Sequence, residues 1–242
     1  SIDGATMVWV PGGEFTMGLS NEEVTAIIHV NPSWREDWFS DCTPKHAIML
    51  EGFWIYENPV TVAQYLSFCA ATGHRIPQKP RWGWLDTHPI VRVSWADAWA
   101  YCQWAGTRLL TEAEWEKAAR GTDSRLFPWG NEWSNSEYLH CSKQRGGDAG
   151  KTAPVGSYSS GASPYGVLDM EGNVGEWCAD FYDINYYRIS PSANPTGPTA
   201  GKSRVRRSGG WYDADRAYFI LPRRFGLGPH AGYHDIGFRC AI

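Results

Sequence analysis

The sequence predicts a single α+β domain with short strands, two or three helices and many turns. The chain has 242 residues, of which 43% are hydrophobic and 20% charged, as is typical of a globular domain with a sizeable core. Its 26 glycines and 15 prolines leave little room for long helices. Its 14 tryptophans can stabilise irregular segments, because a buried indole fills a large volume and donates a hydrogen bond.

The charge balance excludes several classes of partner. The 22 basic and 26 acidic residues give a net charge of −4, so no basic excess points to nucleic acid or to an anionic membrane surface. The apolar runs are short, far below the roughly 20 residues that span a bilayer. No signal peptide is visible at the first residues. We therefore expect no nucleic-acid partner and no membrane span.

The first part of the chain contains strand patterns and one helix. Residues Met7–Gly18 predict a hairpin with its turn at Pro11-Gly12-Gly13. Residues 21–46 are polar and interrupted, and we assign no element to them. Residues Ile48–Tyr56 predict one strand. Residues Thr61–Thr72 predict a helix, because Thr61 can cap it, apolar residues follow at helical spacing, and Gly73 can end it.

Two further helices follow a proline-containing loop at residues 74–92. Residues Ser94–Ala105 begin with a capping box, in which Asp97 stands three residues after Ser94. Residues Thr111–Arg120 begin with a second capping box and end in basic residues. After Gly121 short strand patterns alternate with turns. The loop at Pro191–Gly201 is too short to separate domains, so we expect one domain over residues 1–242.

Six cysteines are dispersed along the chain and form no CxxC pair, so neither a zinc ribbon nor a thioredoxin-type site is expected. Their even number permits disulfides, and buried free thiols are an equal alternative. The six are Cys42, Cys69, Cys102, Cys141, Cys178 and Cys240.

Seven motifs occur in an order that resembles the formylglycine-generating enzyme (sulfatase-modifying factor) family. The resemblance implies that family's irregular variant of the C-type lectin fold, with two to three helices and small antiparallel sheets. Its members include oxidases that convert a cysteine to formylglycine, iron enzymes that form C–S bonds, and non-catalytic binding proteins. The motifs are Pro11–Gly18, Pro59–Thr61, Pro89–Trp95, Trp104–Glu116, Phe127–Gly130, Asp169–Trp177 and Ile236–Cys240.

The resemblance also implies a structural calcium ion at Asp169, Gly172, Val174 and Glu176. Two carboxylates and two carbonyls at this spacing suit an ion that prefers six to eight hard oxygen ligands. The alternative is that Asp169 caps a turn and Glu176 forms a surface salt bridge. A second calcium site of the family matches less well, with Asp148 as a candidate ligand, and stays open.

Enzymatic members carry two cysteines that bind copper shortly after a Gly-Gly-Ser, and this chain lacks them. The corresponding positions are near Ala214 and Phe219, whose methyl and phenyl groups cannot bind a soft metal. We therefore expect no formylglycine-generating activity and neither copper nor iron. Cys102 and Cys240 match a pair that forms a disulfide in some members, and they would stay thiols in a reducing cell.

The histidines offer one further metal hypothesis. His230, His234 and Asp235 lie close together in the sequence, as in a non-haem iron site. However, adjacent residues in a strand point to opposite faces, so ligand-contacting or solvent-exposed histidines are the favoured interpretation.

Residues 211–235 differ from the flanking family motifs, because they contain no asparagine and many aromatic residues. This pattern resembles the variable proteins of diversity-generating retroelements, in which a C-terminal segment is diversified on a fixed scaffold. Such a mixture of aromatic, acidic and basic residues is typical of a binding surface, although about half of the segment can be core. The expected ligand contacts are Tyr212, Asp213, Asp215, Tyr218, Arg224, Phe225, Leu227, His230, Tyr233, His234 and Asp235.

The leading hypothesis is therefore a non-catalytic binding protein with a diversified site, whose ligand is a protein or a cell-surface molecule. This hypothesis favours the cell surface or secretion. The alternatives are a metal-dependent oxidoreductase of the family with an altered active site, or a non-catalytic paralogue that modulates such an enzyme, and these favour the cytoplasm. An enzyme requires a concave pocket with converging ligands, whereas a binding protein exposes aromatic residues on a rigid face.

Overall fold

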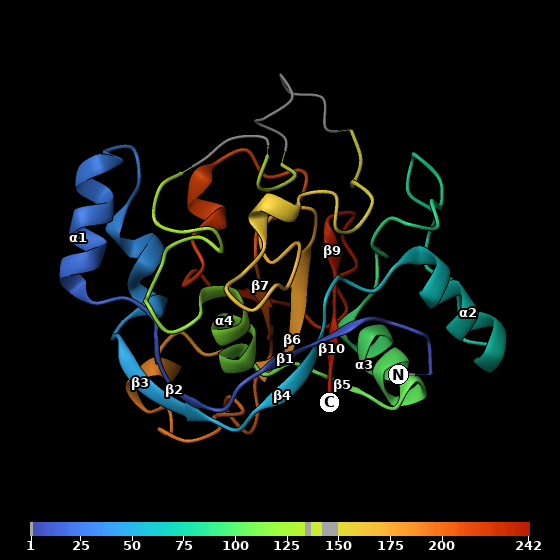
Figure 1. The fold of residues 1–242 in the computed structure, drawn as a ribbon, viewed down its shortest axis with the longest axis horizontal. Coiled ribbons are helices and arrows are strands. Elements are labelled where there is room, and N and C mark those ends of the chain that lie inside the picture. Colours follow the sequence, from blue (N-terminus) through green and yellow to red (C-terminus); the bar gives the residue numbers. More distant parts are fainter. Residues whose placement is uncertain (1, 134–136, 142–149) are drawn as a thin grey trace.

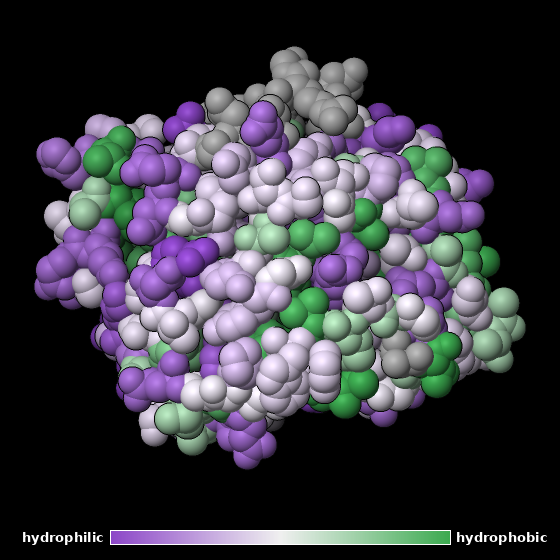
Figure 2. All heavy atoms as spheres, in the orientation of Figure 1, coloured by the Kyte–Doolittle hydropathy of each residue, from purple (hydrophilic) through white to green (hydrophobic). Residues whose placement is uncertain are grey.

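The structure, a computed structural model, describes residues 2–133, 137–141 and 150–242. Asp148, the candidate ligand of a second calcium site, lies outside these residues. Helix α4 lies near the centre, with α1 on one side and α2 and α3 on the other (Figure 1). On this face hydrophobic residues lie between polar ones rather than in one continuous patch (Figure 2). No helix in the described ranges is long and apolar enough to cross a membrane.

A capping box begins each of the four α-helices in the described part of the chain. In each box the capping side chain accepts a hydrogen bond from the third helical residue, whose own side chain bonds back to the cap. The three predicted helices are confirmed. The fourth, α1, begins with a box of Ser20 and Glu23 that we did not predict, because only Val24 and Ile27 of this polar helix are buried. The helices are α1 (Asn21–Val30), α2 (Val62–Thr72), α3 (Trp95–Ala105) and α4 (Glu112–Arg120).

Short 3₁₀ helices lie between the regular elements, as expected for a chain so rich in glycine and proline. They are η1 (Glu36–Cys42), η3 (Ser159–Gly161), η4 (Tyr186–Arg188) and η5 (Arg216–Phe219).

Within the described residues the strands form three small sheets, which are antiparallel except where β6 pairs with β9. The first has the order β1 (Met7–Val10), β4 (Phe53–Tyr56), β10 (Cys240–Ala241) and β5 (Arg108–Leu109). The second pairs β2 (Gly13–Met17) with β3 (His46–Leu50). The third has the order β8 (Phe225–Leu227), β7 (Arg204–Arg207), β6 (Gly175–Phe181) and β9 (Ile236–Gly237).

The predicted hairpin at Met7–Gly18 is wrong. Its two strands exist, but β1 pairs with β4 and β2 pairs with β3. Gly12 and Gly52 allow the chain to cross closely here, because a Cβ atom on Gly12 would lie only 2.9 Å from the backbone nitrogen of Gly52. The chain passes from one sheet to the other at this point, and the predicted strand at Ile48–Tyr56 is likewise divided into β3 and β4.

A network of buried ion pairs connects α4 to the C-terminal half. Glu112 accepts hydrogen bonds from Arg207 at 2.9 Å and from Arg224 at 2.7 Å. Glu116 accepts from Arg207 at 2.8 Å and from Arg120 at 3.0 Å. Burial opposes ionisation of Glu116, yet Arg207 and Arg120 hold its pKa below the ordinary value. The Glu116 carboxylate therefore stays charged, and the ion pairs of both glutamates fix α4 against β7.

All six cysteines are buried, and Cys42, Cys69, Cys102, Cys178 and Cys240 are free thiols. The sulfur atoms of Cys102 in α3 and Cys240 in β10 lie 3.4 Å apart. Burial and the neighbouring Cys102 raise the pKa of the Cys240 thiol well above its ordinary value. The native thiol is therefore protonated and poorly reactive.

We expect oxidative refolding to join Cys102 to Cys240, because the native fold already places their sulfur atoms in contact. The closed loop of more than a hundred residues would raise the free energy of unfolding by about 4 kcal/mol. Peptide mapping by mass spectrometry identifies the bridge, and Cys69→Ser serves as a control that leaves it intact. A different pairing in the refolded protein contradicts this prediction.

Asp180 in β6 makes the stability depend on pH. Its carboxylate accepts a hydrogen bond from the Glu112 backbone nitrogen at 2.8 Å, but burial and the charge of Glu112 raise its pKa to about 8. Between about pH 4 and pH 8 the folded protein therefore holds a proton that the unfolded chain has lost, so stability falls as pH rises through this range.

The variant Asp180→Asn should remove this loss. We expect it to be more stable than the parent at pH 8 by about 1 kcal/mol or more, since one unit of pKa shift is worth about 1.4 kcal/mol, and equal to it near pH 4. Thermal unfolding across this range measures the difference, with the exposed Asp86→Asn as control. A difference that does not change with pH contradicts the assignment.

Candidate functional site

Two framework strands hold the ends of residues 211–235 together. The segment leaves β7 through Gly209 and Gly210 and returns at β9, and both strands pair with β6. A Cβ atom on Gly210 would lie 2.9 Å from the backbone oxygen of Asp235, so the two ends are in contact. The backbone nitrogen of Gly175 also donates to that oxygen at 2.8 Å. The segment is thus a loop with fixed ends.

Trp211 anchors the start of the loop. Its indole is buried and donates to the backbone oxygen of His234 at 2.9 Å, while its backbone nitrogen donates to Asn173 at 2.9 Å. The ring also lies edge-on to Trp82, with centroids 5.2 Å apart. The loop at residues 74–92 therefore supports this surface, although its sequence carried no signal for that role.

The structure exposes several predicted contacts. The Tyr212 side chain is 61% exposed and Tyr233 is 56% exposed, and Tyr218 and His230 are exposed as well. Asp213, Asp215, Phe225, Leu227, His234 and Asp235 are partly buried.

The expectation that Arg224 lies on the surface is wrong. Its guanidinium is buried and donates to both carboxylate oxygens of Glu112 at 2.7 Å. The acidic partner lies more than a hundred positions earlier in the chain, so the sequence around Arg224 could not show the pairing.

The exposed aromatic residues form two groups on this surface. In the first, Tyr212 and His234 lie against Trp211, with their ring centroids 5.1 Å from each other. In the second, Tyr218 and Phe225 stack with centroids 5.5 Å apart. The guanidinium groups of Arg206 and Arg223 each lie 5.0 Å from the Phe225 ring, so cation–π contacts hold this pair in place.

Two of the predicted acidic contacts support the loop. Asp213 accepts from the Gly210 backbone nitrogen at 2.8 Å and pairs with Arg206 at 3.3 Å. Asp215 caps η5 by accepting from the Ala217 nitrogen at 3.0 Å. Their carboxylate oxygens are therefore used largely for hydrogen bonds and an ion pair within the protein.

A cleft beside the loop contains an arginine that we did not predict as a contact. We call it the Arg216 cleft. Three segments line it: Asn31 and Trp34 just after α1, residues 126–133, and residues 214–220. Its two adjoining parts have volumes of about 360 and 250 Å³. The Arg216 guanidinium lies 5.2 Å from the Trp133 ring and pairs with no carboxylate in the described residues.

The two positions where the resemblance places copper-binding cysteines have different surroundings. Ala214 lines the Arg216 cleft, whereas Phe219 is fully buried. The Phe219 ring lies against Gly209, where a Cβ atom would come within 2.5 Å, and packs on Trp133 with centroids 5.9 Å apart. Phe219 is therefore a core residue of this loop.

The proposed calcium loop is partly occupied by other partners. Both Glu176 oxygens accept from Arg239, at 2.7 to 3.0 Å, and one also accepts from the Trp115 indole at 2.8 Å. The alternative of a surface salt bridge is wrong, since this pair is fully buried. As arranged, Glu176 does not fit a calcium ligand.

Asp169 fits that role better. Its buried carboxylate accepts from the Gly156 nitrogen at 2.9 Å and contacts the Asn173 amide at 3.4 Å, and burial raises its pKa. Positive φ angles at Asp169, Gly172 and Asn173 curl this loop. No group of three histidine, cysteine, aspartate or glutamate side chains suited to a metal occurs in the residues that the structure describes. Calcium therefore stays a prediction.

The variant Glu176→Gln tests what Glu176 does. We expect it to lower the free energy of unfolding by about 3 to 5 kcal/mol in the presence of a calcium chelator, because it leaves the buried Arg239 charge without its partner. Denaturant unfolding with and without calcium measures this loss, with the exposed Glu14→Gln as control. If the loss appears only when calcium is added, Glu176 is a ligand and its pairing with Arg239 is secondary.

Comparison with known proteins identifies the family. Residues 2–242 match the model of the sulfatase-modifying factor enzyme 1-like domain. The formylglycine-generating enzyme of Streptomyces coelicolor is 32% identical, over 97% of this chain and 88% of its own length. The hercynine oxygenase of Mycolicibacterium smegmatis is 32% identical, over 85% of this chain and 54% of its own length.

Solved structures show the same fold. PvdO from Pseudomonas aeruginosa superposes with a TM-score of 0.83 and 27% identity, covering 100% of this chain and 95% of PvdO. Variable protein 1 of Treponema denticola superposes with a TM-score of 0.74 and 21% identity, covering 98% of this chain and 95% of that protein. The predicted α+β fold, an irregular C-type lectin fold, is confirmed. The chain belongs to the family of sulfatase-modifying factor enzyme 1-like domains.

Proposed function

We propose that this chain is a non-catalytic binding protein, and that residues 211–235 with the Arg216 cleft bind a protein ligand. The observation that carries the proposal is the exposure of aromatic side chains on a loop with fixed ends. A rigid binding surface loses little conformational entropy when it binds, so exposed rings on it contribute efficiently to affinity.

Contacts within the protein hold the loop in place, so the loop does not depend on a ligand to order it. Trp211 is held by His234 and Asn173, and Arg224 is held by Glu112 in the core. Tyrosine side chains on such a surface offer a large apolar area and a hydroxyl group with only two rotatable bonds. Tyr212, Tyr218 and Tyr233 are therefore the proposed central contacts.

The Arg216 cleft defines the chemistry of the proposed ligand. Its guanidinium lies over Trp133 and has no carboxylate partner among the described residues. A ligand carboxylate could form charge-assisted hydrogen bonds there, next to an indole that accommodates an apolar side chain. The proposed ligand is a protein segment with an acidic residue beside an apolar one.

One observation favours the alternative, an oxidoreductase with an altered active site. The Arg216 cleft includes Ala214, one of the two positions where the resemblance places a copper-binding cysteine. A cleft in this place could hold a substrate. The absence of both cysteines argues against oxidation of a cysteine there, since a methyl group is no ligand for copper.

Selection from a random peptide library displayed on phage tests the binding proposal. We expect the selected peptides to be rich in acidic and apolar residues. Their affinity should fall at least tenfold, about 1.4 kcal/mol, for each of Tyr212→Ser, Tyr233→Ser and Arg216→Ser. The control Ile189→Ser removes an apolar residue outside the site that is 75% exposed, more than Tyr212 or Tyr233, and it should leave affinity unchanged. If the affinity of the selected peptides is unchanged in all three variants, the proposal is contradicted.

A cysteine-containing sulfatase peptide with added copper tests the alternative. We expect no conversion to formylglycine. Turnover would overturn the non-catalytic assignment, whatever the result of the peptide selection.

The proposed diversification of residues 211–235 has its own test. A gene for a reverse transcriptase next to a near-copy of the last coding segment would support it. Related genomes in which neither accompanies this gene, and in which these residues do not vary, would contradict it while leaving the binding proposal intact.

A further inference from the structure

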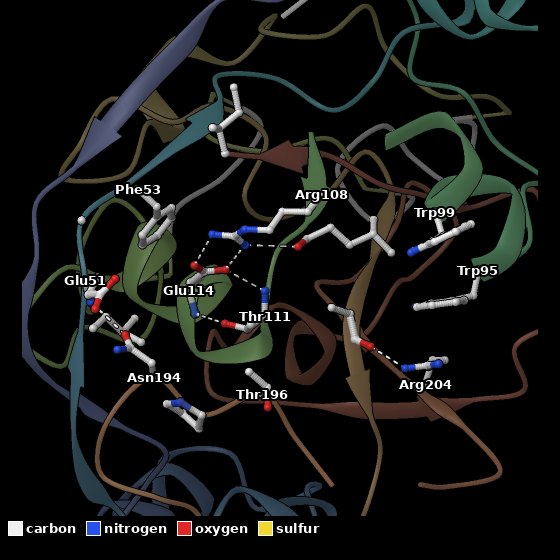
Figure 3. Close-up of a pocket in the computed structure, with 16 residues that line it drawn as sticks. Glu51, Phe53, Trp95, Trp99, Arg108, Thr111, Glu114, Asn194, Thr196 and Arg204 are labelled. Carbon is white, nitrogen blue, oxygen red and sulfur yellow. Dashed lines mark hydrogen bonds and ion pairs between the residues drawn. The ribbon is translucent and has the colours of Figure 1, made fainter. Parts of the chain in front are cut away.

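A second pocket lies away from residues 211–235 and belongs to none of the features above. It has a volume of about 650 Å³ and is bounded by α3, the ends of β4 and β5, and residues 194–196. Figure 3 shows Glu51 and Asn194 on one side of it, and Trp95, Trp99 and Arg204 on the other. Most of its lining comes from segments that are far apart in the sequence.

Two tryptophans on one face of α3 form an apolar wall. Trp95 and Trp99 stand four residues apart, so their side chains lie one turn from each other. The indole nitrogen of Trp95 donates to the Cys178 backbone oxygen at 2.8 Å, which fixes that ring. The Trp99 side chain is 48% exposed and has no such bond in the described structure. Its ring is therefore available to a flat ligand.

Arg204 provides a fixed positive charge beside these rings. Its guanidinium carbon lies 3.7 Å from the Trp95 ring centroid and 3.5 Å from that of Phe181, so the group is stacked between two aromatic faces. One nitrogen donates to the Ala179 backbone oxygen at 2.6 Å. Arg204 forms no salt bridge with any described carboxylate, and its remaining N–H groups have no acceptor among the described residues. Such a preorganised guanidinium suits a carboxylate ligand.

The other charged residues at the pocket do not remove its preference for a carboxylate ligand. Arg108 binds Glu114 through two hydrogen bonds of 2.7 Å, so the two charges neutralise each other. The Glu114 carboxylate is further held by the Thr111 backbone nitrogen at 2.8 Å. Glu51 lies on the side of the pocket opposite Arg204 in Figure 3 and is exposed to solvent, which screens its charge.

We propose that this pocket binds a small carboxylate that carries a flat aromatic ring, with the carboxylate on Arg204 and the ring on Trp99. The pocket is large enough for such a molecule, and its walls combine apolar surface with the unpaired positive charge of Arg204, as small-molecule sites commonly do. The site stands on different residues from the proposed protein-binding surface, so either can fail without the other.

Three indole probes of equal ring and different charge test the proposal: indole-3-acetate, indole-3-acetamide and tryptamine. The indole N–H signals of Trp95 and Trp99 report binding in nitrogen-15 NMR spectra. We expect saturable binding of indole-3-acetate with a dissociation constant of about 1 mM, as for a ligand of this size. The amide should bind at least tenfold more weakly, and tryptamine more weakly still.

Variants separate the roles of charge and ring. Arg204→Gln should reduce the preference for indole-3-acetate over its amide to about one, and thermal unfolding verifies that this variant is folded. Trp99→Ala should weaken binding of all three probes. Trp54→Ala is the matched control, because Trp54 is 45% exposed, similar to Trp99, and does not line the pocket.

Three outcomes would overturn the proposal. The first is equal affinity for the three probes. The second is a loss with Trp54→Ala as large as that with Trp99→Ala. The third is absence of saturation at concentrations ten times the expected constant.

Discussion

Two glutamates in α4 determine how the two halves of this chain pack. Glu112 and Glu116 are one turn apart and buried. Glu112 pairs with Arg207 and Arg224 from distant parts of the sequence, and Glu116 pairs with Arg207 and with Arg120 one turn along the same helix. Charges removed from water destabilise a protein unless every one is paired, so this arrangement tolerates no shift of β7 or of residues 211–235 against α4. Regular hydrogen-bond ladders are short in this molecule, and the ionic network compensates by making one packing of the loops much better than any other.

Local chemistry was readable from the sequence, whereas long-range pairing was not. The capping boxes at Thr61, Ser94 and Thr111 predicted three helices, because the bonds in a capping box join residues only three positions apart. The box at Ser20 follows the same rule but begins a helix that buries few residues. The partners of β1 and β2 depend on a contact between Gly12 and Gly52, and no pattern within either strand signals it.

The same distinction applies to the sites. The segment at 211–235 could be recognised because its composition departs from the motifs on either side, and Tyr212, Tyr218 and Tyr233 are indeed exposed. Arg224 was predicted at the surface because an arginine is usually exposed unless a buried carboxylate pairs with it. The Arg216 cleft and the pocket between α3 and residues 194–196 combine residues from three or more separate segments each, so only the folded chain reveals them.

The contact between Gly210 and Asp235 has a consequence for how this protein can change. Since the framework strands already close the loop, the entropy of loop closure does not depend on the side chains between these residues. Exposed positions such as Tyr212 and Tyr233 contribute little to the core, so replacing them leaves most of the folding free energy in place. Mutational tolerance is therefore concentrated on the surface that we propose as the binding site. A chain built in this way can acquire new specificities without first acquiring extra stability.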